Sequence, residues 1–162
     1  MGRLFRWFSR PLLALQDSEK AHSRSLLLLR LASSNPIFRG VLRLLYKPKK
    51  SLRTTCFGLE FSHPFGLAAG MDKRAEALRG WESIGLAFSE IGGVTMLEQS
   101  GNPKPRMFRH GQDRALVNRM GFNNPGSEKI VKRLRRAGEQ KIPIWANLGK
   151  SKLTPVSYTH LR

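Results

Sequence analysis

From residue 51 onward, strand-like and helix-like segments alternate along the chain, and this order constrains the fold more than any other feature. Such alternation predicts parallel strands joined by right-handed crossovers. Two architectures fit the pattern: an open doubly wound sheet, and the first part of a (β/α)8 barrel. A complete barrel takes about 250 residues, far more than follow residue 50. The predicted strands are 57–61, 65–69, 87–94 and 142–148, the helices are 74–84 and 127–137, and a long loop covers 95–125.

Residues 1–50 differ from the rest, because they contain helical patterns with much apolar surface and many arginines. In residues 1–16 the apolar side of the helical wheel contains Phe5, Phe8, Leu12 and Leu15, and Arg3, Arg6 and Arg10 cluster elsewhere. A second helix is predicted after an Asp17 N-cap, to about Ala32, and a third at 37–46, followed by a linker at 47–50. So small a unit cannot bury this surface alone, which favours packing on a partner domain or lipid. An interfacial helix is favoured for residues 1–16, with an arginine-rich targeting presequence as the alternative.

The charge is strongly basic, with 29 Lys and Arg against 11 Asp and Glu, a net of +18. This balance is compatible with a nucleic-acid-associated protein. No helix-turn-helix, zinc-binding spacing or RNA-binding aromatic motif accompanies it, so we expect no nucleic-acid partner and favour an anionic membrane surface. Cys56 is the only cysteine, which excludes an intrachain disulfide and a cysteine-based metal site. No metal site is predicted.

Small or polar residues stand where three predicted strands end. Lys73 closes the segment Gly66–Lys73, two glycines lie within Glu90–Thr95, and Asn147 lies within Ile144–Lys150. Small residues let a flat ring or a phosphate approach the backbone closely. Singly, these motifs also fit a tight turn with a solvated lysine, or packing glycines. Because barrel active sites lie at the carboxyl ends of the strands, their convergence favours a ligand site and the start of a barrel.

The long loop contains two further motifs, Gly101–Arg109 and Asn118–Asn124. Three asparagines and Phe122 within seven loop residues are costly unless the amides find partners. Amides suit a planar ring that bears carbonyl and N–H groups, and Phe122 could pack against such a ring. A turn-rich loop that needs left-handed residues explains the composition equally well.

In their order along the chain, the segments G-L-A-A-G-x-D-K, E-I-G-x-V-T, G-N-x-K-P-R-x-F-R, N-R-M-G-F-N-N and N-x-G-K resemble the dihydroorotate dehydrogenase family over roughly residues 57–155. The segment Asp17–His22 also resembles the helical extension of the quinone-using, membrane-associated class. The resemblance implies an α/β fold: the N-terminal part of a (β/α)8 TIM barrel, truncated, preceded by a small helical membrane- and quinone-binding extension. The implied parts are 1–50 for the extension, 51–156 for the first β/α units of the FMN-binding barrel, and 157–162 for a non-native tail.

The family oxidises dihydroorotate to orotate on FMN in pyrimidine biosynthesis, and in this class a membrane quinone reoxidises the flavin. By resemblance, the cofactor-binding residues are Ala69, Gly70, Lys73, Gly93 and Asn147. The substrate-binding residues are Lys73, Asn118, Arg119, Met120, Gly121 and Phe122. His22 and Arg109 match residues of the quinone tunnel.

The sequence departs from the family pattern in two places. Gly93 stands where many members have Thr or Ser, and residues 157–162 do not continue the pattern. The catalytic Ser base and the phosphate-binding glycines lie downstream in the family, so we expect this chain alone to be inactive and unstable. The resemblance further implies peripheral contact with the cytoplasmic side of a bacterial cell membrane through residues 1–46. A soluble flavin-dependent barrel oxidoreductase is the alternative enzyme, but such enzymes lack the N-terminal helices.

Overall fold

A computed structural model of the chain describes residues 5–50 and 52–153. The predicted N-terminal helices are present: a π-helical turn η1 (Phe5–Ser9), α2 (Arg10–Ala14), α3 (Ser18–Ser34) and α4 (Pro36–Tyr46). Pro11 lies in the first turn of α2, where its missing N–H leaves no hydrogen bond unmade. Asp17 caps α3 as predicted, since its Oδ1 accepts a hydrogen bond from the Lys20 N–H at 2.9 Å. Asn35 caps α4 in the same way, through the Ile37 N–H at 2.8 Å.

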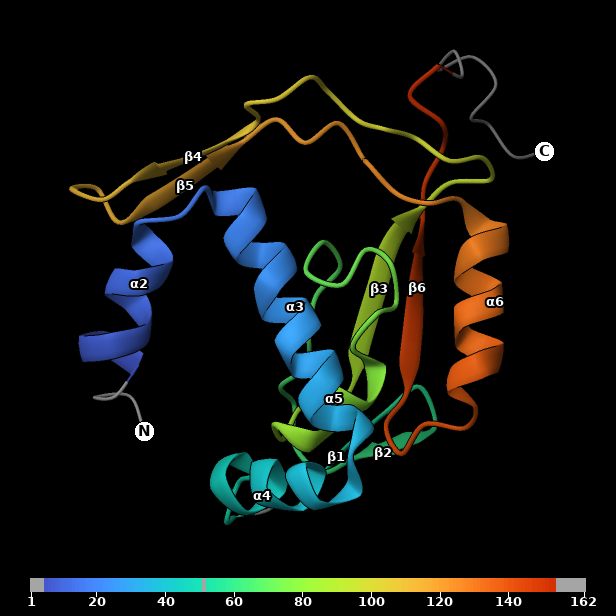
Figure 1. The fold of residues 1–162 in the computed structure, drawn as a ribbon. Coiled ribbons are helices and arrows are strands. Elements are labelled where there is room, and N and C mark those ends of the chain that lie inside the picture. Colours follow the sequence, from blue (N-terminus) through green and yellow to red (C-terminus); the bar gives the residue numbers. More distant parts are fainter. Residues whose placement is uncertain (1–4, 51, 154–162) are drawn as a thin grey trace.

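Two parallel strands form the centre of the second part of the chain, residues 52–153 (Figure 1). Strand β3 (Ser89–Val94) pairs with β6 (Ile144–Leu148), and α6 (Ser127–Ala137) lies between them in sequence, which confirms the predicted crossover. The predicted strand at 65–69 is reduced to one parallel bridge between Leu67 and Ser89. The predicted helix at 74–84 is shorter, because Ala75 has a φ of 54° and α5 covers only Leu78–Ser83. The result is part of an α/β fold that does not close into a barrel.

Two antiparallel hairpins were not predicted. Strands β1 (Thr54–Cys56) and β2 (Leu59–Phe61) form the first, in place of a single strand at 57–61. Strands β4 (Met107–His110) and β5 (Ala115–Asn118) form the second, inside the segment predicted as a loop. Most residues of β4 and β5 are exposed, on both faces of this hairpin. Without one buried face, the strands lack the alternation of apolar and polar residues by which sequence identifies them.

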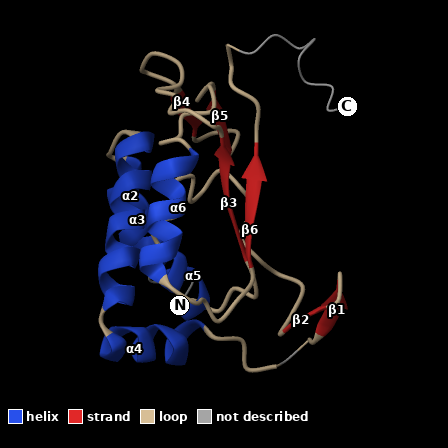
Figure 2. Ribbon diagram, turned by 90° about the vertical axis from the view of Figure 1, so that its right-hand side faces the viewer, coloured by secondary structure: helices blue, strands red, loops and turns tan. Residues whose placement is uncertain are grey.

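Helices cover one side of the parallel strands, and both buried apolar clusters lie there. Figure 2 shows α3, α5 and α6 together on that side of β3 and β6. One buried cluster joins β3 to α6 and consists of Ala75, Leu78, Ile91, Val94 and Ile130. A second joins α3 to α5 and consists of Leu26, Ala77 and Trp81. The extension is therefore packed on the second part through α3, whereas most large apolar side chains of α2 and α4 are exposed.

Some predictions concern residues outside those described. Arg3 and the proposed tail at 157–162 are among them. Across 5–50 and 52–153, none of the helices has the length and hydropathy required to cross a bilayer.

Candidate functional site

A cavity of about 680 Å³ lies where β3 and β6 end, beside β5 and the start of α3. All of the predicted cofactor and substrate residues line it, together with His22 from the extension. Met71, Met107, Leu116 and Asn123 complete its wall. The structure therefore brings together residues that are more than 100 positions apart in the sequence. Ala69, Gly70, Lys73, Gly93, Asn118, Arg119, Met120, Gly121, Phe122 and Asn147 are the predicted residues that line the cavity.

Two glycines give the backbone the openness that a flat ring requires. Gly70 has a φ of 104°, and a Cβ built on it would meet nothing within 4 Å. A Cβ on Gly93 would lie 3.6 Å from Asn147 Oδ1 and 3.8 Å from Phe122 Cδ1, so this position faces both side chains. The Gly70 N–H donates to the Gly92 carbonyl at 2.9 Å, which fixes the two strand ends against each other. This open backbone, lined by amides and a lysine, fits a planar heterocycle such as a flavin ring.

Glu90 orients two of the residues that line the cavity. Its Oε1 accepts a hydrogen bond from Asn147 Nδ2 at 3.1 Å, and its Oε2 accepts one from the Ala69 N–H at 3.2 Å. Sequence reasoning quoted Glu90 within a motif but gave it no role. The signal was available in principle, because Glu90 and Asn147 lie on strands that were predicted to be parallel, and these strands are neighbours in the sheet.

Burial lowers the pKa of two of the three basic side chains that line the cavity, those of Lys73 and His22. Lys73 Nζ donates to the Gly70 carbonyl at 2.8 Å, and burial lowers the pKa of this ammonium group, against the opposing effect of Glu19. Burial also lowers the pKa of His22 from 6.5, and the positive charge of Lys73 adds to the effect. His22 is therefore neutral at pH 7, and its ring offers one donor and one acceptor.

The asparagines of the 118–124 segment fall into two groups. Asn124 is buried and structural, since its Oδ1 accepts from the Gly126 N–H at 2.9 Å and its Nδ2 donates to Thr95 Oγ1 at 2.9 Å. Asn118 ends β5, and its Oδ1 accepts a long hydrogen bond from the Met120 N–H at 3.4 Å. Asn123 was not among the predicted residues, yet it lines the cavity and its buried Oδ1 has no partner within the described residues.

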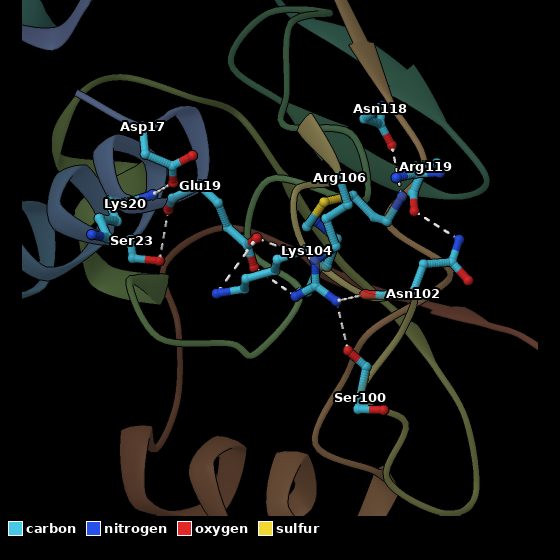
Figure 3. A network of polar contacts seen from close by, with 12 residues as sticks. Asp17, Glu19, Lys20, Ser23, Ser100, Asn102, Lys104, Arg106, Asn118 and Arg119 are labelled. Atoms are coloured by element: carbon cyan, nitrogen blue, oxygen red, sulfur yellow. Dashed lines mark hydrogen bonds and ion pairs between the residues drawn. The ribbon is translucent and has the colours of Figure 1, made fainter. Parts of the chain in front are cut away.

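A buried ion pair fastens the extension to the loop that precedes β4 (Figure 3). The Arg106 side chain is only 7% exposed, and its Nη2 donates to Glu19 Oε1 at 2.6 Å, with Nε to Oε2 at 3.1 Å. The third nitrogen, Nη1, donates to the carbonyls of Ser100 at 2.7 Å and Asn102 at 2.9 Å. Hydrogen bonding to Arg106 lowers the pKa of Glu19. Sequence analysis missed this contact because its two partners are 87 positions apart.

Arg109 does not join His22 at the cavity. Its Nη1 donates to the carbonyls of Gln16 at 2.8 Å and Ala14 at 3.3 Å, at the turn between α2 and α3. The proposed tunnel role of Arg109 therefore stays a prediction. Among the described residues, His, Cys, Asp and Glu form no cluster of three that could hold a metal ion.

Comparison with known proteins identifies the family. The sequence profile of dihydroorotate dehydrogenase matches residues 51–160. A dihydroorotate dehydrogenase (quinone) of Thermus thermophilus is 49% identical over 143 residues, which are 86% of this chain and 41% of the relative. The enzyme of the same name from Gloeobacter violaceus is 48% identical over 151 residues, 91% of this chain and 42% of the relative.

A solved structure has the same fold. The crystal structure of DHODH from Eimeria tenella in complex with ferulenol matches with a TM-score of 0.70 and 34% identity, over 85% of this chain and 37% of that chain. The chain thus spans about two fifths of the length of its curated relatives. On the profile match and on motifs that converge on one cavity, this chain belongs to the dihydroorotate dehydrogenase family.

Proposed function

We propose that the protein carrying this chain oxidises dihydroorotate to orotate in pyrimidine biosynthesis, with FMN as cofactor and a membrane quinone as electron acceptor. One observation carries the proposal: the residues expected to contact cofactor, substrate and quinone line the same 680 Å³ cavity, except Arg109. The names of the relatives, dihydroorotate dehydrogenase (quinone), support the same reaction.

Five residues are proposed to hold the flavin. When bound, FMN would supply hydride acceptance and electron transfer, chemistry that amino-acid side chains lack. Ala69, Gly70 and Gly93 would allow the ring to approach the backbone, and Asn147 would contribute an amide whose orientation Glu90 fixes. Lys73 would place its ammonium group at the ring edge, where it favours negative charge.

The substrate is proposed to bind against the segment from Asn118 to Phe122. Dihydroorotate is a carboxylate with ring carbonyl and N–H groups, so it requires a cation, amide donors and amide acceptors. Lys73 would pair with the carboxylate, and the Asn118 amide would bind the ring. Phe122 would cover the ring and exclude water, while Arg119, Met120 and Gly121 shape the backbone beneath it.

The extension is proposed to bring the quinone to the cavity. His22 lines the cavity from α3 and, being neutral, can hydrogen-bond a quinone carbonyl. Arg109 would polarise the quinone at the outer end of the proposed quinone tunnel. Peripheral contact with the cytoplasmic side of the membrane through residues 1–46 is supported by the exposed apolar side chains of this region, of which Trp7, Phe8, Leu12 and Leu15 belong to η1, α2 and its C-cap.

The test uses the full-length protein that carries this chain. Purified protein should contain FMN and reduce a quinone only when dihydroorotate is present. Lys73→Ala should lower kcat/KM for dihydroorotate at least about 100-fold, because a charge-assisted contact in a water-poor site is lost. Lys132→Ala, which removes an exposed lysine on α6, is the control and should leave kcat/KM unchanged. If the purified protein contains flavin but dihydroorotate does not reduce that flavin, the proposal is refuted.

A further inference from the structure

A second cavity, of about 480 Å³, lies away from the site described above. Its walls are the end of α3, the segment leading into α5 together with the first two residues of α5, and the end of α6. None of the predicted cofactor, substrate or quinone residues lines it. Its most distinctive feature is the chemistry of its lining, in which four arginines face a single carboxylate: Arg30, Arg79, Arg133, Arg136 and Glu76.

The arginines differ in how far the protein itself satisfies them. Arg79 Nη2 donates to the Ala137 carbonyl at 3.0 Å, and Arg133 Nη1 donates to the Arg74 carbonyl at 2.8 Å and lies 3.6 Å from Glu76 Oε1. Within residues 5–50 and 52–153, the guanidinium groups of Arg30 and Arg136 make no hydrogen bond or ion pair. Four cations against Glu76 leave a local charge of +3 (4 − 1) in the lining. Guanidinium groups in this arrangement are suited to a phosphate, which they bind through paired N–H donors.

The cavity lies next to the start of α4, a helix whose large apolar side chains are mostly exposed. Ser33 and Ser34 line the cavity, and α4 begins two residues later at Pro36. On α4, Ile37 is 74% exposed and Leu44 is 85% exposed, and no residue of this helix is buried. Its N-terminus, two residues from the cavity, adds a positive dipole end to the arginines. A cationic cavity beside an apolar helix matches the two halves of a phospholipid, a phosphate and an acyl chain.

We propose that this cavity binds the phosphodiester headgroup of an anionic phospholipid, while the apolar side of α4 inserts among the acyl chains. The inference rests on the proposed membrane contact and deepens it, because it assigns headgroup recognition to Arg30, Arg79, Arg133 and Arg136. Three of these lie outside residues 1–46, so the second part of the chain takes part in membrane recognition alongside the extension.

The test measures sedimentation of the full-length protein with vesicles of phosphatidylcholine alone, and with vesicles of phosphatidylcholine and phosphatidylglycerol in equal amounts. The variant Arg30→Gln with Arg136→Gln removes the two arginines without internal partners. Partition onto the anionic vesicles should fall about 30-fold, the amount that two cations near a membrane surface account for. The matched control, Arg114→Gln with Arg135→Gln, removes two exposed arginines that do not line the cavity. It should lose less than about threefold.

Each outcome decides the matter. An unchanged partition of the cavity variant overturns the proposal. An equal loss in both variants also overturns it, because the attraction is then that of a basic surface for any polyanion, nucleic acid included. Dihydroorotate-dependent reduction of a water-soluble quinone in detergent separates this proposal from the proposed function. That activity should be retained by the cavity variant, since neither arginine lines the 680 Å³ cavity. Its absence from the unsubstituted protein would refute the proposed function alone.

Discussion

Glu19 and Arg106 form the contact that holds the start of α3 against the loop before β4, and Glu19→Gln tests its strength. The substitution keeps the size of the side chain and one acceptor oxygen but removes the negative charge. Arg106 would then keep its hydrogen bonds to the carbonyls of Ser100 and Asn102. Its buried positive charge would, however, lose its carboxylate counter-ion.

The magnitude follows from burial. The side chains of Arg106 and Glu19 are 7% and 16% exposed, so solvent screens the pair only weakly. Removing one partner of a buried ion pair costs about 3–5 kcal/mol. Because glutamine still accepts one hydrogen bond, we expect the lower end, about 3 kcal/mol of unfolding free energy. For a domain of 150–250 residues that would correspond to a decrease in Tm of roughly 6–12 °C, and for the longer full-length protein we expect the lower end of this range.

The assay is thermal unfolding of the full-length protein followed by circular dichroism, with Glu98→Gln as the control. Glu98 is also paired with a lysine, but both side chains are largely exposed, so we expect no measurable change in Tm. A double-mutant cycle with Arg106→Gln should return a coupling energy of about 1.5–3 kcal/mol. A Tm for Glu19→Gln equal to that of Glu98→Gln would show that the pair does not fasten α3 to the loop.

Three further predictions concern acid, a buried carboxylate and two glycines. Since Arg106 holds the pKa of Glu19 below 4.5, the pair stabilises the fold above that pH, and the stabilisation is lost as the pH falls through the lowered pKa. Urea unfolding between acid and neutral pH should therefore show that acid reduces the free energy of unfolding less in Glu19→Gln than in the unsubstituted protein. Asp72→Ala should cost at least about 3 kcal/mol of unfolding free energy, because the Asp72 carboxylate accepts hydrogen bonds from the Glu76 and Ala77 N–H groups and from Trp81 Nε1. A cost below about 1 kcal/mol in chemical denaturation would contradict this role. Gly93→Ser should change stability by less than about 0.5 kcal/mol, since a Cβ there meets only ordinary contacts. Gly92→Ser should destabilise strongly in the same denaturation experiment, because its φ is 109° and its Cβ would lie 2.6 Å from the Asn147 carbonyl oxygen.

Local sequence patterns predicted the elements that are stabilised locally. Asp17, the predicted cap of α3, bonds the N–H of a residue three positions away, and Asn35, which was not predicted as a cap, bonds an N–H two positions away at the start of α4. The crossover from β3 through α6 to β6 was evident because a buried strand and an amphipathic helix have different periods of apolar residues. The predicted bounds of α6 agree with the structure at both ends.

The β4–β5 hairpin and the shortened α5 could not be predicted in this way. The hairpin has no buried face to impose alternation. The start of α5 is fixed by Asp72, whose carboxylate binds the backbone of Glu76 and Ala77 and so holds the chain before the helix in a turn.

By itself, the sequence determined the N-terminal helices, the crossover from β3 through α6 to β6, and the family motifs with the candidate site residues that they contain, because these depend on residue type and spacing. Only the tertiary structure decided which of those residues share a cavity. It placed His22 beside Lys73, turned Arg109 toward Gln16, and gave Glu90 and Arg106 their partners. Contacts of this kind join positions tens of residues apart, and their energies depend on burial and distance, which spacing along a chain does not specify.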